Sequence, residues 1–284
     1  MKEFAFTQID RKIWIEDICN LRAHKEDYKD GLRLLFPGLK EKDLKPEHIA
    51  PLACLIEDFS RSRIRIQLEL NSEAGNALMN KYNFRAYWAG KQNYSESGDD
   101  KVLNLQRIVE TEKELYGRRV SEYLKTHFFR KKDMSPVNNS ITEALYNIFD
   151  HADAKDNAFS IVLFDEIKSE LDVAICDFGK GIAKTVKDFT KEDMSDAEAI
   201  KRAMTDHFTI GSTTHNGGLG LGNIRSCCTD RDFLCIISNK AIFVANSTNE
   251  KCISLEADFA GTLIFYSMSL SHFDDEDVLG DFNW

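Results

Sequence analysis

Three polar residues at four-residue intervals, Glu143, Asn147 and His151, are the first group whose types fit a chemical site. On a helix expected over residues 141–152 they share one face, opposite an apolar one. An asparagine oxygen can ligate Mg²⁺, and a glutamate can orient or deprotonate an attacking water. His151 can reach a phosphate or line the pocket wall. The three side chains together fit a metal-bound triphosphate, although an ordinary amphipathic helix gives the same pattern.

A second candidate site follows an alternating segment, residues 171–176, that predicts a strand. Asp177 comes directly after it, and a carboxylate at a strand end can accept a hydrogen bond from the amino group of adenine. Gly179 and Gly181 allow a sharp turn and a close approach of the backbone to the base. An Asp-x-Gly-x-Gly run is also common as a surface turn.

A third candidate is a concentration of glycines, seven of the fifteen lying between residues 179 and 222. Gly218, Gly220 and Gly222 open a helix predicted to end near Cys228. Glycines before a helix N-terminus expose N–H groups to an anion, and the helix dipole adds to the attraction. The run is neither a P-loop, which needs Gly-Lys-Ser/Thr, nor a dinucleotide fingerprint.

The interval between the two glycine motifs spans about thirty residues. An interval of that length predicts a mobile cover over a bound ligand. Thr213 and Thr214 can donate to phosphate oxygens there, and His215 follows them. Small polar residues are equally expected in any exposed loop.

The polar segment 90–100 is interpreted as a linker between two parts of the chain. Before it, a helix over 48–60, an alternating strand over 64–70 and a helix over 76–82 predict a small α/β domain, residues 1–95. After it we expect a larger domain, residues 96–271, and an acidic tail, residues 272–284. Within the larger domain we expect helices over 102–129, 141–152 and 196–204, and strands over 160–164, 171–176, 234–238, 241–245, 252–256 and 262–268.

Composition limits the functional classes. A net charge of −10 argues against a large nucleic-acid footprint, because clustered Lys and Arg supply affinity for phosphate backbones. No apolar stretch approaches the roughly 20 residues that span a bilayer. The N-terminus lacks the features of a signal peptide. Seven cysteines without zinc spacing predict reduced thiols in a cytoplasmic protein.

In this order the motifs resemble the GHKL ATP-binding superfamily over residues 103–270. The series Glu143…Asn147…His151 is similar to its N box, Asp177–Gly181 to its first glycine box, Gly218–Gly222 to its second, and Gly261-Thr262 to its closing motif. The resemblance implies a two-layer α/β sandwich of the Bergerat type with a mixed sheet, and ATP and Mg²⁺ as cofactors.

The same resemblance assigns roles to residues. Asn147 is the expected Mg²⁺ ligand, Asp177 the adenine contact, and Glu143 the general base. The full set of expected nucleotide-binding residues is Asn147, His151, Asp177, Gly179, Gly181, Phe208, Thr213, Thr214, Gly218, Leu219, Gly220, Leu221, Gly222 and Thr262.

The N-terminal segment resembles STAS-like domains in its order of helix, strand and helix, which implies protein partners bound through that domain. None of the seven histidines is followed by an acidic residue, which disfavours a histidine kinase. Three functions stay open. The first is an ATPase whose ATP-bound lid and homodimer act as a switch in a multi-protein regulatory or defence system. The others are an anti-sigma-type serine/threonine kinase and a non-hydrolysing ATP-sensing adaptor.

Overall fold

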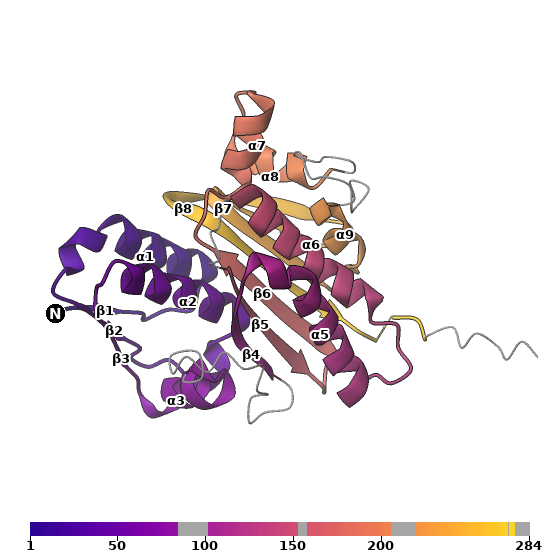
Figure 1. The fold of residues 1–284 in the computed structure, drawn as a ribbon, viewed down its shortest axis with the longest axis horizontal. Coiled ribbons are helices and arrows are strands. Elements are labelled where there is room, and N and C mark those ends of the chain that lie inside the picture. Colours follow the sequence, from indigo (N-terminus) through magenta and orange to yellow (C-terminus); the bar gives the residue numbers. More distant parts are fainter. Residues whose placement is uncertain (85–101, 153–157, 206–219, 272, 276–284) are drawn as a thin grey trace, which may run out of the picture.

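Two β-sheets with helices between and beside them organise the chain in the computed structural model (Figure 1). The structure describes residues 1–84, 102–152, 158–205, 220–271 and 273–275. The predicted linker, residues 90–100, therefore lies outside the described residues. In the described ranges no helix has the length and apolar character needed to cross a bilayer.

The first sheet belongs to an N-terminal module, residues 1–84, whose three strands pair in parallel in the order β1-β2-β3. Parallel neighbours need a crossover, and α1 and α2 supply it. The elements are β1 (Lys2–Ala5), α1 (Arg11–Ala23), β2 (Leu32–Leu35), α2 (Pro46–Arg61), β3 (Ile66–Glu69), α3 (Ser72–Gly75) and a π-helical turn (Asn76–Lys81), with 3₁₀ turns at Lys25–Tyr28 and Glu41–Asp43.

The second sheet has the order β4-β5-β6-β8-β7, and each of these described pairings is antiparallel. The α/β sandwich is confirmed, but the sheet is antiparallel here rather than mixed. The elements are β4 (Val102–Ile108), α5 (Lys113–His127), α6 (Ser135–Ala152), β5 (Ala158–Asp165), β6 (Glu170–Asp177), α7 (Ile182–Thr190), α8 (Asp196–Ala203), α9 (Gly220–Ser226), β7 (Phe233–Ala245) and β8 (Glu250–Ser269).

Both faces of this second sheet are buried. In β6, Val173 and Ile175 pack in the core formed with α5, α6 and α9, whereas Ala174 and Cys176 pack in a core shared with the N-terminal module. Figure 1 shows α5 and α6 crossing one face of the sheet, with the N-terminal module beside it. Helices therefore cover both faces.

Helix α2 explains how the N-terminal module joins the sheet. It contacts β3 of its own sheet and also β5 and β6 of the second one. Its buried residues run around its circumference, as expected for a helix that is enclosed on all sides. The fully buried ones include Ile49, Leu52, Leu55 and Phe59.

One secondary-structure prediction was wrong, and several elements, among them β1, α1, β2 and α7, were not predicted. Residues 102–129 are not a single helix: 102–108 form strand β4, and α5 begins only at Lys113. Val102, Leu105 and Ile108 are buried at spacings of three, which fit a helix, but pairing with β5 through a bulge overrides that pattern. Helix α7 was missed because no side chain of its own caps it.

Three further predictions concern the strands after residue 233, the helix over 196–204 and the acidic tail. The four strands expected after residue 233 merge into the two long strands β7 and β8. The helix predicted over 196–204 is confirmed as α8, which begins with the capping box of Ser195 and Glu198. The start of the predicted acidic tail is packed against the rest of the chain, because Phe273 is buried and Asp275 forms a β-bridge with Lys132.

Candidate functional site

Asp177, Thr262 and Ser238 form a row across three neighbouring strands. Asp177 ends β6 and pairs with Thr262 of β8, which pairs in turn with Ser238 of β7. All three have no exposed area. Strand alternation places the row on the sheet face covered by α6 and α9, because residues two positions away from each belong to that core. Asp177, the expected adenine contact, thus faces the layer of helices that includes α6, and α6 carries Asn147, the expected metal ligand.

The Asp177 carboxylate is held by two backbone donors. Its Oδ1 accepts from the Gly179 N–H at 2.6 Å, and its Oδ2 accepts from the Thr262 N–H at 3.1 Å. Burial raises the pKa of Asp177 to about 7, against the lowering effects of these two bonds and of the positive charge of Arg22. A buried carboxylate that titrates near neutrality is a candidate for a functional group.

Glycine is required at two positions beside Asp177. Gly261 has φ +141°, and a Cβ there would lie 2.2 Å from the Asp177 carbonyl oxygen. Gly181 has φ +84°, and a Cβ there would lie 2.6 Å from both the Gly261 carbonyl oxygen and Ser238 Oγ. Gly181 therefore takes a backbone conformation that favours glycine, whereas its expected approach to a base stays a prediction. Gly179 contributes the N–H described above.

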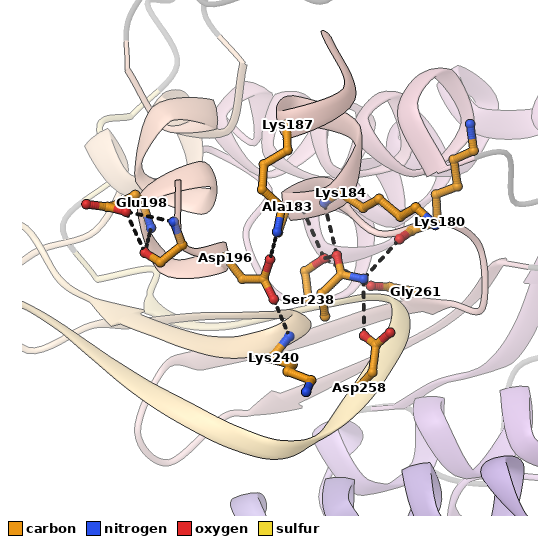
Figure 2. Close-up of polar contacts among 12 residues, drawn as sticks. Lys180, Ala183, Lys184, Lys187, Asp196, Glu198, Ser238, Lys240, Asp258 and Gly261 are labelled. Carbon is orange, nitrogen blue, oxygen red and sulfur yellow. Dashed lines mark hydrogen bonds and ion pairs between the residues drawn. The ribbon is translucent and has the colours of Figure 1, made fainter. Parts of the chain in front are cut away.

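The N-terminus of α7 is capped by side chains from the sheet (Figure 2). The N–H groups of Ile182, Ala183 and Lys184 donate to Thr262 Oγ1, Ser238 Oγ and Asn239 Oδ1, at 3.3, 3.4 and 3.1 Å. The first N–H groups of α7, which have no acceptor within the helix, are thus already hydrogen-bonded to other parts of the protein. An anion at this helix end would have to displace these bonds.

A β-bulge aims two of these capping side chains. The pairing of β7 with β8 shifts register around Ser238 and Asn239, and Asn239 has φ +51°. A bulge bends the strand and redirects its side chains. Asn239 Nδ2 also donates to the Lys180 carbonyl oxygen and to Asp258 Oδ1, both at 3.2 Å (Figure 2). The turn after Asp177 is therefore fixed to β7 and β8.

Glu143 and Asn147 lie one turn apart on α6, and both are buried. Asn147 Nδ2 donates to the Glu143 carbonyl oxygen at 2.8 Å and lies 3.5 Å from Glu143 Oε1. The first bond fixes the amide orientation, so Oδ1 points away from that carbonyl and can serve as a metal ligand. Helix α6 contacts β6, which ends at Asp177, and it also contacts α7 and α9.

The remaining predicted site residues are only partly described. Helix α9 begins at Gly220, and Leu221, Ile224 and Cys228 are buried in the helical core, as their spacing predicts. Leu221 thus packs as a core residue, and Gly222 is half-buried. His151 lies in α6, but its side chain lies outside the described residues, as do Phe208, Thr213, Thr214, His215, Gly218 and Leu219.

Sequence reasoning missed Arg22, Ser238, Asn239 and Asp258. The run Ser238-Asn239-Lys240 between two expected strands was the available signal, because such residues favour turns and bulges. Arg22 gave no signal, because it lies far from the motifs in sequence. Its contacts with Ala260 and Phe178 are treated below.

No family model matches the chain, and the search of curated proteins returned no match. In the described residues no group of three or more His, Cys, Asp or Glu side chains is arranged to hold a metal ion.

Proposed function

We propose that the chain binds Mg-ATP and hydrolyses it as a GHKL-type ATPase, acting as a nucleotide-dependent switch. The observation that supports this best is the buried Asp177 carboxylate at the end of a central strand, paired with Thr262. Its environment matches the role that the resemblance implies for it. A purely structural role, closing the Gly179 turn, would use the same two hydrogen bonds, and ATP binding distinguishes the two roles.

The chemistry of the Asp177 carboxylate favours adenine. An ionised carboxylate offers about four acceptor positions, and Gly179 and Thr262 use two of them. The amino group of adenine is a donor and can occupy a third. Guanine carries a carbonyl oxygen at the equivalent position, which a carboxylate repels. We therefore expect ATP to bind much more tightly than GTP.

Glu143 and Asn147, one turn apart on α6, suit a magnesium ion that is bound mainly by phosphates and water. Mg²⁺ prefers oxygen ligands and keeps several waters, so one protein oxygen from Asn147 is sufficient. When bound, the ion would neutralise phosphate charge. Glu143, one turn away, would orient or deprotonate a water. Because Asp177 has no exposed area, a base that contacts it must first displace the atoms that cover it.

The wider role follows from the resemblance and from composition. All seven cysteines lie in the described ranges and are free thiols, which suits the reducing cytoplasm. We infer that the N-terminal module binds a protein partner in a regulatory or defence system, and that the switch includes a homodimer. A serine/threonine kinase of the anti-sigma type and a non-hydrolysing adaptor are the alternatives.

The test is to follow the fate of γ-labelled ATP with Mg²⁺ in purified protein. We expect saturable binding, release of labelled phosphate, and loss of binding in Asp177→Asn, because the amide cannot accept at both positions. Phosphate transferred to a co-purified partner would select the kinase. Tight binding without turnover would select the adaptor, and no ATP binding at all would refute the nucleotide site.

A further inference from the structure

Arg22, in the last turn of α1, contacts both chain segments that build the Asp177 site. Its Nη1 donates to the Ala260 carbonyl oxygen at 2.7 Å. Its guanidinium carbon lies 3.6 Å from the centre of the Phe178 ring. Phe178 follows Asp177 directly, and Ala260 precedes the Gly261-Thr262 pair. One side chain of the N-terminal module therefore holds the two strand segments that meet at the carboxylate.

The Arg22 side chain is itself fixed in place. It is only 18% exposed, and its Nε lies 3.9 Å from Asp58 of α2. The Phe178 ring beneath it packs edge-on against Phe259 of β8, with the ring centres 5.7 Å apart. A planar guanidinium can stack on a ring and donate from its edge at once, which an ammonium group cannot do.

The geometry beneath Arg22 leaves little room for movement. Gly261 lies against the Asp177 main chain, so a shift of Phe178 or Ala260 changes the positions of the N–H groups that hold the carboxylate. Removing the guanidinium also removes a positive charge that favours the ionised carboxylate.

We propose that Arg22 is a positioning residue for base recognition, through which the N-terminal module sets the affinity for adenine nucleotides. This inference rests on the proposed nucleotide site. Arg22 does not itself touch the base; it acts by holding the segments that carry Asp177 and Thr262.

The first measurement needs no nucleotide. Residue-resolved hydrogen exchange in Arg22→Met should show the Gly179 and Thr262 amides exchanging about tenfold faster than in the wild type, because the carboxylate that accepts from them is no longer held. Lys25→Met is the matched control: Lys25 pairs with the same Asp58, at 2.9 Å, and its ammonium group lies 5.9 Å from the centre of the Phe59 ring. We expect wild-type exchange at both amides in this control.

The second measurement compares ATP with purine riboside triphosphate, whose base has a hydrogen in place of the amino group. A loss of carboxylate positioning should weaken ATP binding about tenfold and leave purine riboside triphosphate binding unchanged, whereas general destabilisation would weaken both equally. Arg22→Lys keeps the charge without the fork, so it should restore part of the preference for ATP. It also serves as the test variant if Arg22→Met does not fold.

The two proposals fail in different ways. A wild-type protein that binds no ATP would refute the proposed function, and this inference with it. If the wild type binds ATP but the Arg22 variants keep the wild-type preference for ATP and wild-type exchange at Gly179 and Thr262, only the role of Arg22 is overturned.

Discussion

Gly261 packs directly on the main chain of Asp177, so closely that a Cβ at position 261 would lie 2.2 Å from the Asp177 carbonyl oxygen. Its φ of +141° is also one that other residues rarely adopt. The glycine at position 261 of β8 is therefore a geometric requirement of the neighbouring strand that carries the buried carboxylate, whatever ligand that carboxylate binds.

We expect Gly261→Ala to lower the free energy of unfolding by about 3 kcal/mol or more, since backbone strain and a steric clash add. Gly38→Ala is the control for strain alone, because Gly38 has φ +74° with open space around its Cβ position. That variant should lose about 1–2 kcal/mol. Urea unfolding measures the free energy of unfolding of both variants. Equal losses in Gly261→Ala and Gly38→Ala would contradict a steric clash at position 261.

The raised pKa of Asp177 makes stability depend on pH. The value rises from 3.8 to about 7 on folding, so the native state binds this proton more tightly than the unfolded chain does. The resulting contribution to the free energy of unfolding is fully present below about pH 4, and it is lost as the pH rises to about 7. Three pKa units correspond to a change on the order of 4 kcal/mol.

Asp177→Asn provides the comparison for this titration. The amide loses one acceptor at every pH, which shifts its stability by a constant amount, but it cannot ionise. Unfolding free energies at pH 4, 5, 6, 7 and 8 should therefore show the wild type losing stability relative to Asp177→Asn as pH rises. Parallel profiles would mean that the carboxylate does not titrate in this range.

Capping of α7 by the sheet predicts a local effect of Ser238→Ala. The Ala183 N–H loses its acceptor, and we expect a loss of about 1 kcal/mol, with faster hydrogen exchange in the first turn of α7. Ser195→Ala removes the cap of α8 and should cost a similar amount, with the faster exchange in α8 instead. If either variant showed faster exchange in both α7 and α8, the two helices would not be capped separately.

The position of Glu143 predicts a separation of binding from turnover. Glu143→Gln keeps the size of the side chain and the main-chain bond to Asn147, so ATP affinity should stay within about twofold. Turnover should fall by about 100-fold or more, the usual contribution of a general base. Phosphate release and equilibrium binding measure the two, with the exposed Glu122→Gln as control. Unchanged turnover would remove Glu143 from the mechanism.

The double covering of the second sheet predicts that the larger, C-terminal part of the chain does not fold alone. A fragment of residues 96–284 would expose one whole sheet face, which includes Phe159, Ile161, Ile237, Leu263 and Phe265. An exposed apolar patch of this kind favours aggregation. We expect an insoluble fragment that becomes soluble when residues 1–95 are co-expressed. A soluble, cooperatively folding fragment would show that the two parts are independent domains.

Local signals made part of this fold predictable. The Ser195 and Glu198 capping box locates α8, the apolar pattern of residues 48–60 locates α2, and the alternation of residues 171–176 locates β6, with Asp177 at its end. Each of these patterns lies within a few residues of the feature it predicts. The spacing of Leu221, Ile224 and Cys228 likewise indicated their burial.

The unpredicted features depend on contacts between distant residues. Residues 102–108 are a strand because β5 lies beside them, and α7 begins where it does because Thr262, Ser238 and Asn239 accept its first N–H groups. The Arg22 contact with Ala260 joins residues 238 positions apart. No window of sequence contains both partners of such a contact.

The enclosure of α2 between two sheets has a consequence for biosynthesis. The strands that α2 contacts, β5 and β6, extend to Asp177, and the residue that Arg22 contacts is Ala260. The N-terminal module therefore leaves the ribosome long before the residues that pack against it have been synthesised. Contacts of such high sequence separation form slowly. We expect nascent chains arrested before β8 to be cleaved readily by protease in residues 1–84, and resistance to appear only once residue 269 has emerged.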